Sequence, residues 1–258
     1  MTMVFKFGGA SVKNADAVRN VVDIIEKYRE EKLVVVISAM GKTTNALEQL
    51  LDAYLSNNEG YKEKIEEIKF FHFDIIRDLF PKQNHFLESE LENLFFDLEF
   101  YFEHQSDQEY DYLYDQIIGF GEILSTRIIS HYLDSKNVAN KWIDARNFII
   151  TDNSFRNAIV DWESTEKLIC QKIAAFIEKK PVITQGFIGS SKSKEYTSLG
   201  REGSDYSAAI FAYALNAKKL MVWKDVPGIL NADPKKFEYT DKFEELTYEE
   251  AIEMTYYG

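Results

Sequence analysis

Several short apolar runs constrain the fold of this chain most strongly. Residues 3–7, 33–37, 181–188 and 220–223 are rich in Val, Ile, Leu, Met and Phe and lack the regular polar alternation of a half-exposed strand. Such runs are typical of strands covered on both faces, as in a parallel sheet. Helical patterns lie between them. The sequence therefore predicts an α/β fold, a three-layer αβα sandwich with a mainly parallel central sheet.

A polar, glycine-bearing loop at residues 198–203 leads into one of the predicted helices. Ser204 and Asp205 lie where this helix begins, and apolar residues follow at helical spacing. Gly200 and Gly203 allow the backbone to approach a ligand closely, and Arg201 offers a planar fork that suits a carboxylate or a phosphate. Because helix N-termini favour negative charge, we expect this segment to bind an anion.

The first apolar run ends in Gly8-Gly9, and a helix capped by Asn14 is expected from about residue 14 to residue 31. A strand, a glycine turn and a helix in this order form a phosphate-binding arrangement, because backbone N–H groups point out of the turn. Lys6 directly precedes the turn and could reach a phosphate oxygen. A tight turn that only packs explains the pattern equally well.

Residues 38–45 follow the second apolar run. The triplet Gly-Lys-Thr at 41–43 resembles the end of a P-loop, but that motif needs glycine at position 36, where the chain has Val36. We therefore reject a P-loop. The hydroxyl groups of Ser38 and Thr44 flank the start of the next helix, and helix capping is a sufficient explanation for both.

Residues 45–131 form a long, mostly helical segment. Between Lys82 and Arg127 there is no lysine or arginine, although carboxylates are frequent. A solvated acidic face over an aromatic interior explains this composition, and docking to a basic partner is the alternative. His72, His85 and His104 are scattered without the spacing of metal ligands, so no metal site is predicted.

Glu122 lies near the end of this helical segment, among apolar neighbours and close behind two glycines. A carboxylate in such surroundings needs a partner, because burying an unpaired charge is unfavourable. A structural ion pair with Arg127 would satisfy it, and so would the ammonium group of a bound substrate.

The rest of the chain adds smaller elements. Strands are expected at 138–143, 148–151 and 244–247, a helix at 162–179, and a mobile hairpin or loop at 190–198 that could cover a site. Thr247 and Glu250 form a capping box for a last helix. The segments 6–11, 38–44 and 186–205 all begin at the carboxyl ends of predicted strands, so we expect them to share one ligand site.

Composition limits the classes of partner and the compartment. The formal net charge of −13 argues against nucleic acid or an anionic membrane as the main partner, because both attract basic surfaces. The single cysteine, Cys170, cannot form an internal disulfide and is expected to be a small core residue. No apolar run reaches membrane-spanning length and no signal peptide precedes the first strand, so we expect a cytoplasmic protein.

Four motifs resemble those of a known family. Residues 185–189 (Gln-Gly-Phe-Ile-Gly), 199–206 (Leu-Gly-Arg-Glu-Gly-Ser-Asp-Tyr) and 223–229 (Trp-Lys-Asp-Val-Pro-Gly-Ile) resemble the aspartate kinases, or aspartokinases, of the amino-acid kinase superfamily. Residues 6–12 (Lys-Phe-Gly-Gly-Ala-Ser-Val) are similar to that family's opening signature, with Ala10 where threonine is usual. The motifs spread over nearly the whole chain, which makes the resemblance specific.

The resemblance implies a phosphotransferase that moves the γ-phosphoryl group of ATP to the β-carboxylate of L-aspartate and gives 4-phospho-L-aspartate. This reaction is the first step toward lysine, threonine and methionine. The implied cofactors are ATP and Mg²⁺, the metal being carried by ATP. The implied catalytic residues are Lys6 and Asp205. The implied aspartate-binding residues are Ser38, Thr44, Glu122, Phe187, Arg201 and Ser204. The implied ATP-binding residues are Lys6, Gly8, Gly9, Ser11, Lys224, Asp225, Leu230 and Lys235.

The sequence departs from the family pattern in several places. Glu202 replaces the glycine that is common between Arg201 and Gly203; it could pair with Arg201 or point outward, and if it points inward it should weaken aspartate binding. Lys224 stands where many relatives have threonine, and Leu230 where some have tyrosine. Neither change abolishes nucleotide binding on physical grounds.

The resemblance also predicts the domain organisation. Residues 1–258 are expected to form a catalytic domain with a helical insertion at about 45–131 and an ATP lobe at about 181–258. Relatives continue past Gly258 with an ATP-binding lysine and C-terminal ACT regulatory domains, which are absent here, so we expect a catalytic domain cut from a longer protein. A homodimer is compatible with the family.

Other functions remain open. Another amino-acid kinase, acting on glutamate, acetylglutamate, carbamate or a uridine nucleotide, would share the fold. A binding module without turnover is compatible with Glu202 and the missing lysine. A purely structural α/β domain leaves Lys6, Glu122, Arg201 and Asp205 unexplained.

Overall fold

The computed structural model describes residues 1–56, 60–82, 85–104, 108–224, 226, 228–234 and 236–257. The chain divides into two compact units, Met1–Trp223 and Lys224–Gly258. Each unit is described by itself below.

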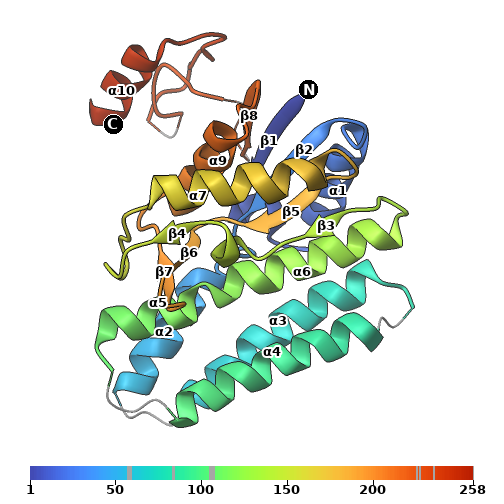
Figure 1. Ribbon diagram of the computed structural model, residues 1–258, viewed down its shortest axis with the longest axis vertical. Helices are drawn as coiled ribbons and strands as arrows, with labels where there is room; N and C mark the ends of the chain where they lie inside the picture. Colours follow the sequence, from blue (N-terminus) through green and yellow to red (C-terminus); the bar gives the residue numbers. More distant parts are fainter. Residues whose placement is uncertain are drawn as a thin grey trace. The chain divides into compact units, whose positions relative to one another are not determined.

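A five-stranded parallel sheet forms the centre of the first unit (Figure 1). Its strands, in spatial order, are β3 (Lys141–Trp142), β5 (Val182–Gln185), β2 (Lys32–Ile37), β1 (Thr2–Phe7) and β8 (Lys219–Trp223). The register pairs Phe7 with Ile37 and Ile37 with Gln185, so three strands end at one edge of the sheet. The predicted parallel sheet is confirmed.

Alternate residues of β1 and β2 face two separate hydrophobic cores. Phe5 and Val35 belong to one core, and Val4 and Val34 belong to the other. Both faces of the sheet are thus covered, as expected for strands without polar alternation. The arrangement confirms the αβα sandwich.

The first core packs against the amino-terminal helices. These are α1 (Ala15–Lys27), α2 (Thr43–Leu55), α3 (Tyr61–Leu79), α4 (His85–His104), α5 (Tyr110–Ile118) and α6 (Phe120–Ser135). In Figure 1, α3 and α4 lie against α6 on the side away from the sheet. Asn14 caps α1 by accepting a hydrogen bond from the Ala17 N–H, as the sequence predicted, although α1 ends at Lys27 rather than near residue 31.

The second core packs against three helical segments on the opposite face of the sheet. These are α7 (Trp162–Leu168), α8 (Ala174–Ile177) and α9 (Gly203–Ala214). A π-helical turn, Ile169–Ile173, joins α7 to α8, so the helix expected at 162–179 is continuous but not uniformly α-helical. Cys170 lies in this turn and is exposed, so the prediction of a core cysteine is wrong. A π turn places one extra residue in the helix and rotates side chains away from the α-helical pattern.

A second, smaller sheet contains β4 (Ile150–Thr151), β6 (Ile188–Ser191) and β7 (Tyr196–Ser198). The apolar run at 181–188 is therefore two strands in two sheets, with Gly186 and Phe187 between them. Phe187 has a left-handed φ of 71°, and a Cβ on Gly186 would lie 2.6 Å from the Ser204 Cβ. This turn brings the end of β5 against the start of α9. The predicted hairpin at 190–198 is the antiparallel pair β6–β7.

Other predicted strands are shorter than expected or missing. The run at 138–143 pairs only at Lys141–Trp142, and the run at 148–151 pairs only at Ile150–Thr151. No strand forms at 244–247, where all four residues are described. That segment contains two glutamates, Glu244 and Glu245, which are poor strand formers.

The second unit contains α10 (Tyr248–Tyr257) and an isolated bridge between Leu230 and Lys242. The Glu250 carboxylate accepts a hydrogen bond from the Thr247 N–H at 2.7 Å, and Thr247 Oγ1 accepts one from the Glu250 N–H at 3.2 Å. The predicted capping box is confirmed. In the described ranges of both units, no helix is long and apolar enough to cross a bilayer.

Candidate active site

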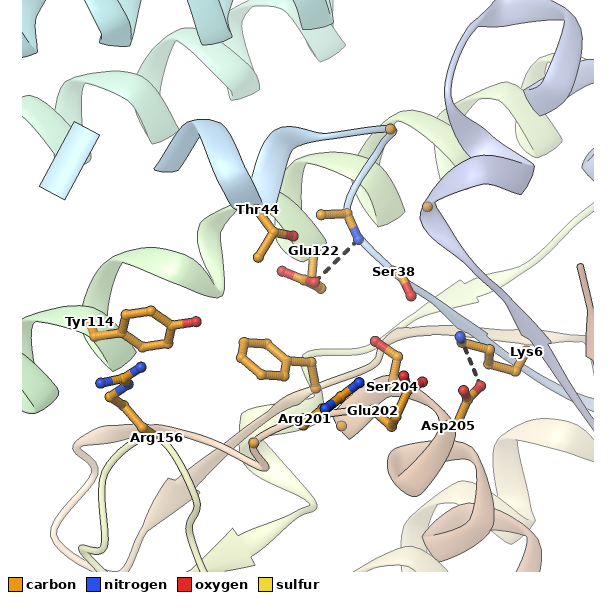
Figure 2. Close-up of a pocket in the computed structure, with 16 residues that line it drawn as sticks. Lys6, Ser38, Thr44, Tyr114, Glu122, Arg156, Arg201, Glu202, Ser204 and Asp205 are labelled. Atoms are coloured by element: carbon orange, nitrogen blue, oxygen red, sulfur yellow. Dashed lines mark hydrogen bonds and ion pairs between the residues drawn. The ribbon is translucent and has the colours of Figure 1, made fainter. Parts of the chain in front are cut away.

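A cavity of about 490 Å³ opens in the first unit, at the carboxyl ends of β1, β2 and β5 and at the start of α9 (Figure 2). Its lining combines cationic, carboxylate, hydroxyl and aromatic side chains with glycines. The lining residues are Lys6, Gly9, Ser38, Ala39, Gly41, Thr44, Tyr114, Glu122, Arg156, Phe187, Gly200, Arg201, Glu202, Gly203, Ser204 and Asp205. The three segments expected to share one site thus meet in one cavity.

Lys6 and Asp205 form an ion pair at one end of the cavity. Lys6 Nζ lies 2.8 Å from Asp205 Oδ1, and only 8% of the lysine side chain is exposed. Lys6 comes from β1 and Asp205 from the first turn of α9, so the pair links the sheet to the helix that carries the anion-binding loop. A buried ammonium group needs such a partner, and the pair fixes where the lysine charge lies.

Gly9 both packs tightly and lines the cavity. A Cβ on Gly9 would lie 2.8 Å from the Ala39 carbonyl oxygen, so the turn packs against the loop that follows β2 and excludes any side chain there. Gly9 also lines the cavity. Gly8 does not line it. Ser11 does not either, and its hydroxyl group donates a hydrogen bond to the Trp223 carbonyl oxygen at 3.3 Å.

Glu122 is a buried carboxylate with one oxygen that is not hydrogen-bonded. Its side chain comes from the first turn of α6 and is 3% exposed. Oε1 accepts a hydrogen bond from the Ala39 N–H at 3.3 Å, whereas Oε2 has no hydrogen-bond partner in the described part of the chain. Burial raises the pKa of Glu122 to about 7, because removal from water disfavours the charged form.

Arg127 does not serve as the partner of Glu122. Its Nε lies 3.0 Å from Glu90 Oε1, and its guanidinium group lies 3.4 Å from the centre of the Trp142 ring. The structure thus excludes the first of the two explanations for Glu122. The second explanation, the ammonium group of a bound substrate, stays a prediction.

Residues 200–203 form a tight turn that presents Arg201 to the cavity. The Gly203 N–H donates to the Gly200 carbonyl at 3.0 Å, and Gly200 has a φ of +74°. The backbone conformation therefore favours glycine, and a Cβ there would also lie 2.7 Å from Asn157 Oδ1. Glu202 follows with a φ of 57°, a left-handed conformation that is rare for a residue with a side chain. Its side chain lines the cavity beside Ser204 and Asp205 (Figure 2).

The structure also places the other predicted aspartate-binding residues. Ser38, Thr44, Phe187 and Ser204 all line the cavity. Thr44 lies inside the first turn of α2, and the residue at the N-cap position, Lys42, makes no side-chain capping bond. Helix capping therefore does not explain Ser38 and Thr44, and both residues line the cavity instead.

The last segment of the chain contains four residues that were predicted to bind ATP. Asp225 and Lys235 fall outside the described residues. Lys224 and Leu230 belong to the second unit. Their role in nucleotide binding stays a prediction.

Tyr114 and Arg156 line the cavity and were not found from the sequence. The Tyr114 hydroxyl group donates to Glu48 at 2.9 Å, and the Arg156 guanidinium group lies 4.7 Å from the centre of the Tyr114 ring and 3.1 Å from Asp111. Tyr114 belongs to a helix with an ordinary apolar pattern, and Arg156 lies in an irregular loop. No local signal marks either residue, because they reach the cavity only through tertiary packing.

The amino acid kinase family model matches residues 1–258, and the chain belongs to this family. Within the family the chain is similar to aspartokinases. It is 33% identical over 256 residues to lysine-sensitive aspartokinase 3 of Escherichia coli (strain K12), a match that covers 99% of this chain and 56% of that protein. It is 35% identical over 268 residues to chloroplastic aspartokinase 1 of Arabidopsis thaliana, covering 100% of this chain and 46% of that protein.

A solved structure supports the same relationship. The crystal structure of E. coli aspartokinase III in complex with aspartate and ADP (R-state) matches with a TM-score of 0.90 and 32% identity, covering 99% of this chain and 56% of that one. The chain thus spans about half the length of these relatives.

Proposed function

We propose that this chain is an aspartate kinase, which transfers the γ-phosphoryl group of ATP to the β-carboxylate of L-aspartate and forms 4-phospho-L-aspartate. The observation that carries the proposal is the buried Glu122 carboxylate, whose Oε2 has no hydrogen-bond partner among the described residues and which lines the same cavity as Arg201 and Lys6. A carboxylate and a guanidinium group in one cavity suit the ammonium and carboxylate groups of an amino acid. The similarity to aspartokinases, one of them solved with aspartate and ADP, agrees with this choice.

The amino acid would be held by groups of opposite charge. Glu122 binds the ammonium group and Arg201 binds a carboxylate. Ser38, Thr44 and Ser204 add hydroxyl contacts, and Phe187 packs at the edge of the substrate. The acceptor carboxylate is already ionised at neutral pH, so no general base is required and the protein contributes chiefly position and charge.

Lys6 would neutralise charge on the transferring phosphoryl group. Its ion pair with Asp205 keeps the ammonium group at the end of the cavity. Asp205 thereby orients Lys6, and Ser204 beside it lies at the helix N-terminus, where negative charge is favoured. Electrostatic stabilisation by groups fixed in advance is the main source of catalysis in phosphoryl transfer.

ATP would lie against the glycine turn, with the backbone of Gly8 and Gly9 holding phosphate oxygens and Ser11 assisting. Lys224, Asp225, Leu230 and Lys235 are the further residues that we propose for the nucleotide. The described residues contain no group of three or more histidine, cysteine or acidic side chains that could hold a metal ion. Mg²⁺ is commonly bound by one or two carboxylates together with substrate phosphates, so Asp205 fits a Mg²⁺ ion that enters with ATP and neutralises phosphate charge.

Trapping of the acyl phosphate with hydroxylamine tests the function. The chain is incubated with Mg-ATP, hydroxylamine and either aspartate, glutamate or carbamate, with the Lys6→Met variant as the control. We expect hydroxamate from aspartate only, and loss of at least about 99% of it in the variant. Product from glutamate or carbamate instead would identify a sibling kinase. Binding of aspartate without turnover would identify a binding module.

Three further expectations belong to the proposal. The chain acts in the cytoplasm, it works on small molecules rather than on nucleic acid or membranes, and it can form a homodimer. The net charge of −13 supports the second of these, because an acidic surface repels polyanions.

A further inference from the structure

Asp115 is a buried carboxylate that the proposed reaction does not use. It lies on α5 and is 2% exposed. Its oxygens accept three hydrogen bonds: Oδ2 from the Arg156 N–H at 2.8 Å and from the Ser198 N–H at 2.8 Å, and Oδ1 from the Ser198 hydroxyl group. All three donors come from residues that are distant in sequence.

The donors lie within or directly before two loops that border the cavity. Arg156 lies between β4 and α7 and itself lines the cavity. Ser198 is the last residue of β7, and the turn at 200–203 that carries Arg201 begins two residues later. Asp115 therefore fixes one backbone point in each loop.

The two loops also contact each other directly. The Ala158 N–H donates to the Ser198 carbonyl at 2.9 Å. A Cβ on Gly200 would lie 2.7 Å from Asn157 Oδ1 and 3.1 Å from the Arg156 carbonyl oxygen. A shift of the loop around Arg156 would therefore push against the turn that holds Arg201.

We propose that Asp115 is a positioning residue, which sets the place of Arg201 by fixing these two loops to α5. The inference rests on the proposed function, in which Arg201 binds a carboxylate of the substrate. Small displacements of a substrate-holding group reduce binding strongly, because the planar guanidinium fork requires a defined orientation. Without the carboxylate, two backbone N–H groups and a hydroxyl group would lose their acceptor in a buried place.

Kinetics of Asp115→Asn test the proposal. The amide has the same shape but carries no charge and only one acceptor oxygen. The Ser198 hydroxyl group therefore loses its acceptor, and the two backbone N–H groups keep only a weaker, uncharged one. We expect the KM for aspartate to rise by about tenfold or more, while the KM for ATP stays within about twofold. Ser198→Ala keeps the carboxylate and removes one bond, so it should give a smaller rise. It also provides a readout if Asp115→Asn fails to fold.

A double-variant cycle separates positioning from a general structural effect. In an Arg201→Ala background, Asp115→Asn should change the KM for aspartate by less than about twofold, because the residue that it positions is gone. The matched control is Asn140→Ala, which breaks another buried side-chain network, to the Ser130 carbonyl and Asp134, away from the cavity. It should leave the KM for aspartate unchanged. If the double variant raises the KM for aspartate by the product of the two single-variant factors, the proposal is wrong.

Hydrogen exchange tests the loop attachment without any need for activity. In Asp115→Asn, the amides of Arg156 and Ser198 should exchange at least about tenfold faster, whereas Asn140→Ala should not affect them. If the wild-type chain phosphorylates no aspartate, the proposed function fails. In that case, amide hydrogen exchange and the affinity for aspartate measured by calorimetry decide whether Asp115 positions Arg201. Unchanged exchange at both amides would refute the attachment itself.

Discussion

Glu122 shows how a single residue can couple substrate binding to pH. Its carboxylate is buried, its pKa is raised to about 7 by that burial, and its Oε2 lines the cavity without a partner among the described residues. Only the ionised form attracts an ammonium group. Proton and substrate therefore compete for the same carboxylate in the pH range where enzymes usually work.

The KM for aspartate is accordingly predicted to depend on pH. Below about pH 7 it should rise by up to about tenfold per pH unit, because the free protein then holds a neutral Glu122, and above that pH it should level off. Stability has the opposite dependence: a raised pKa favours folding at low pH, and this contribution is lost as pH rises from about 4.5 to about 7. Michaelis constants measured from pH 5.5 to 8.5 test this. Glu122→Gln should remove the slope, and a slope that survives in this variant would assign it to another group.

Arg201→Lys keeps the positive charge but removes the planar fork. We expect the KM for aspartate to rise at least about tenfold, with nucleotide affinity changed by less than about twofold. Initial rates at varied aspartate and varied ATP provide both values. An unchanged aspartate requirement would remove Arg201 from the substrate site.

Glu202→Gly should improve the protein in two respects. The residue has a φ of 57°, where a side chain costs about 1 kcal/mol relative to glycine, so the variant should melt a few degrees higher. It also removes a carboxylate from the cavity that binds the dicarboxylate substrate, so the KM for aspartate should fall. Lys194→Gly is the matched control, because Lys194 has a φ of 70° with an ordinary long side chain and does not line the cavity. It should raise the melting temperature alone, and an equal fall in KM there would contradict the argument.

The candidate site could be predicted from the sequence where its residues lie in motifs. Lys6 directly precedes a glycine turn, and Glu122 and Arg201 each follow glycines, so local signals marked all three residues. The strand ends predicted that Lys6 and Arg201 share one site, and the family resemblance added Glu122. Tyr114 and Arg156 have no such signal, because the packing of α5 and of an irregular loop brings them to the cavity. Asp115 was also missed, since its three donors are distant in sequence.

At the scale of elements, the sequence predicted the long helices and the buried strands but not where a strand stops. The run at 138–143 is apolar enough for six residues, yet only Lys141 and Trp142 pair, with Val182 and Ile183 of β5. β3 is at the edge of the sheet, so its length depends on one neighbouring strand. The strand break at Phe187 lies against α9, and the π turn at 169–173 contacts Ala214. Neither contact can be inferred from the local sequence pattern.

Helix α3 carries a buried histidine whose titration should affect stability. His72 is fully buried, its Nδ1 lies 2.8 Å from the Ile68 carbonyl oxygen, and burial lowers its pKa to about 4. The unfolded chain binds a proton near pH 6.5 and the folded chain does not, so stability is lost as pH falls from about 6.5 to about 4.

Urea unfolding between pH 7 and pH 4.5 measures this effect. The free energy of unfolding should fall on acidification by on the order of 2–3 kcal/mol from His72 alone, and His72→Leu should reduce the fall by that amount. His85→Gln is the control, because the His85 side chain is 80% exposed. An identical pH dependence in wild type and His72→Leu would show that His72 does not contribute.

At the scale of the whole molecule, the chain consists of two compact units, and every residue that lines the cavity belongs to the first. The sequence predicted one catalytic domain with an ATP lobe at about 181–258, and this organisation stays a prediction. Within that range, β5, α9 and β8 belong to the first unit, whereas Lys224 and Leu230 belong to the second. Apolar patterns showed which segments are buried, but they do not show which segments pack as one unit.

Three residues that line the cavity, Arg156, Phe187 and Glu202, have left-handed backbones with φ values of 66°, 71° and 57°. Each of these side chains is retained at a penalty of about 1 kcal/mol relative to glycine. A laboratory selection for heat resistance alone should therefore drift toward glycine at Glu202 but not at the other two positions, because Phe187 packs against both hydrophobic cores and Arg156 pairs with Asp111. Selection for heat resistance and selection for aspartate binding should thus converge at this one position of the cavity wall.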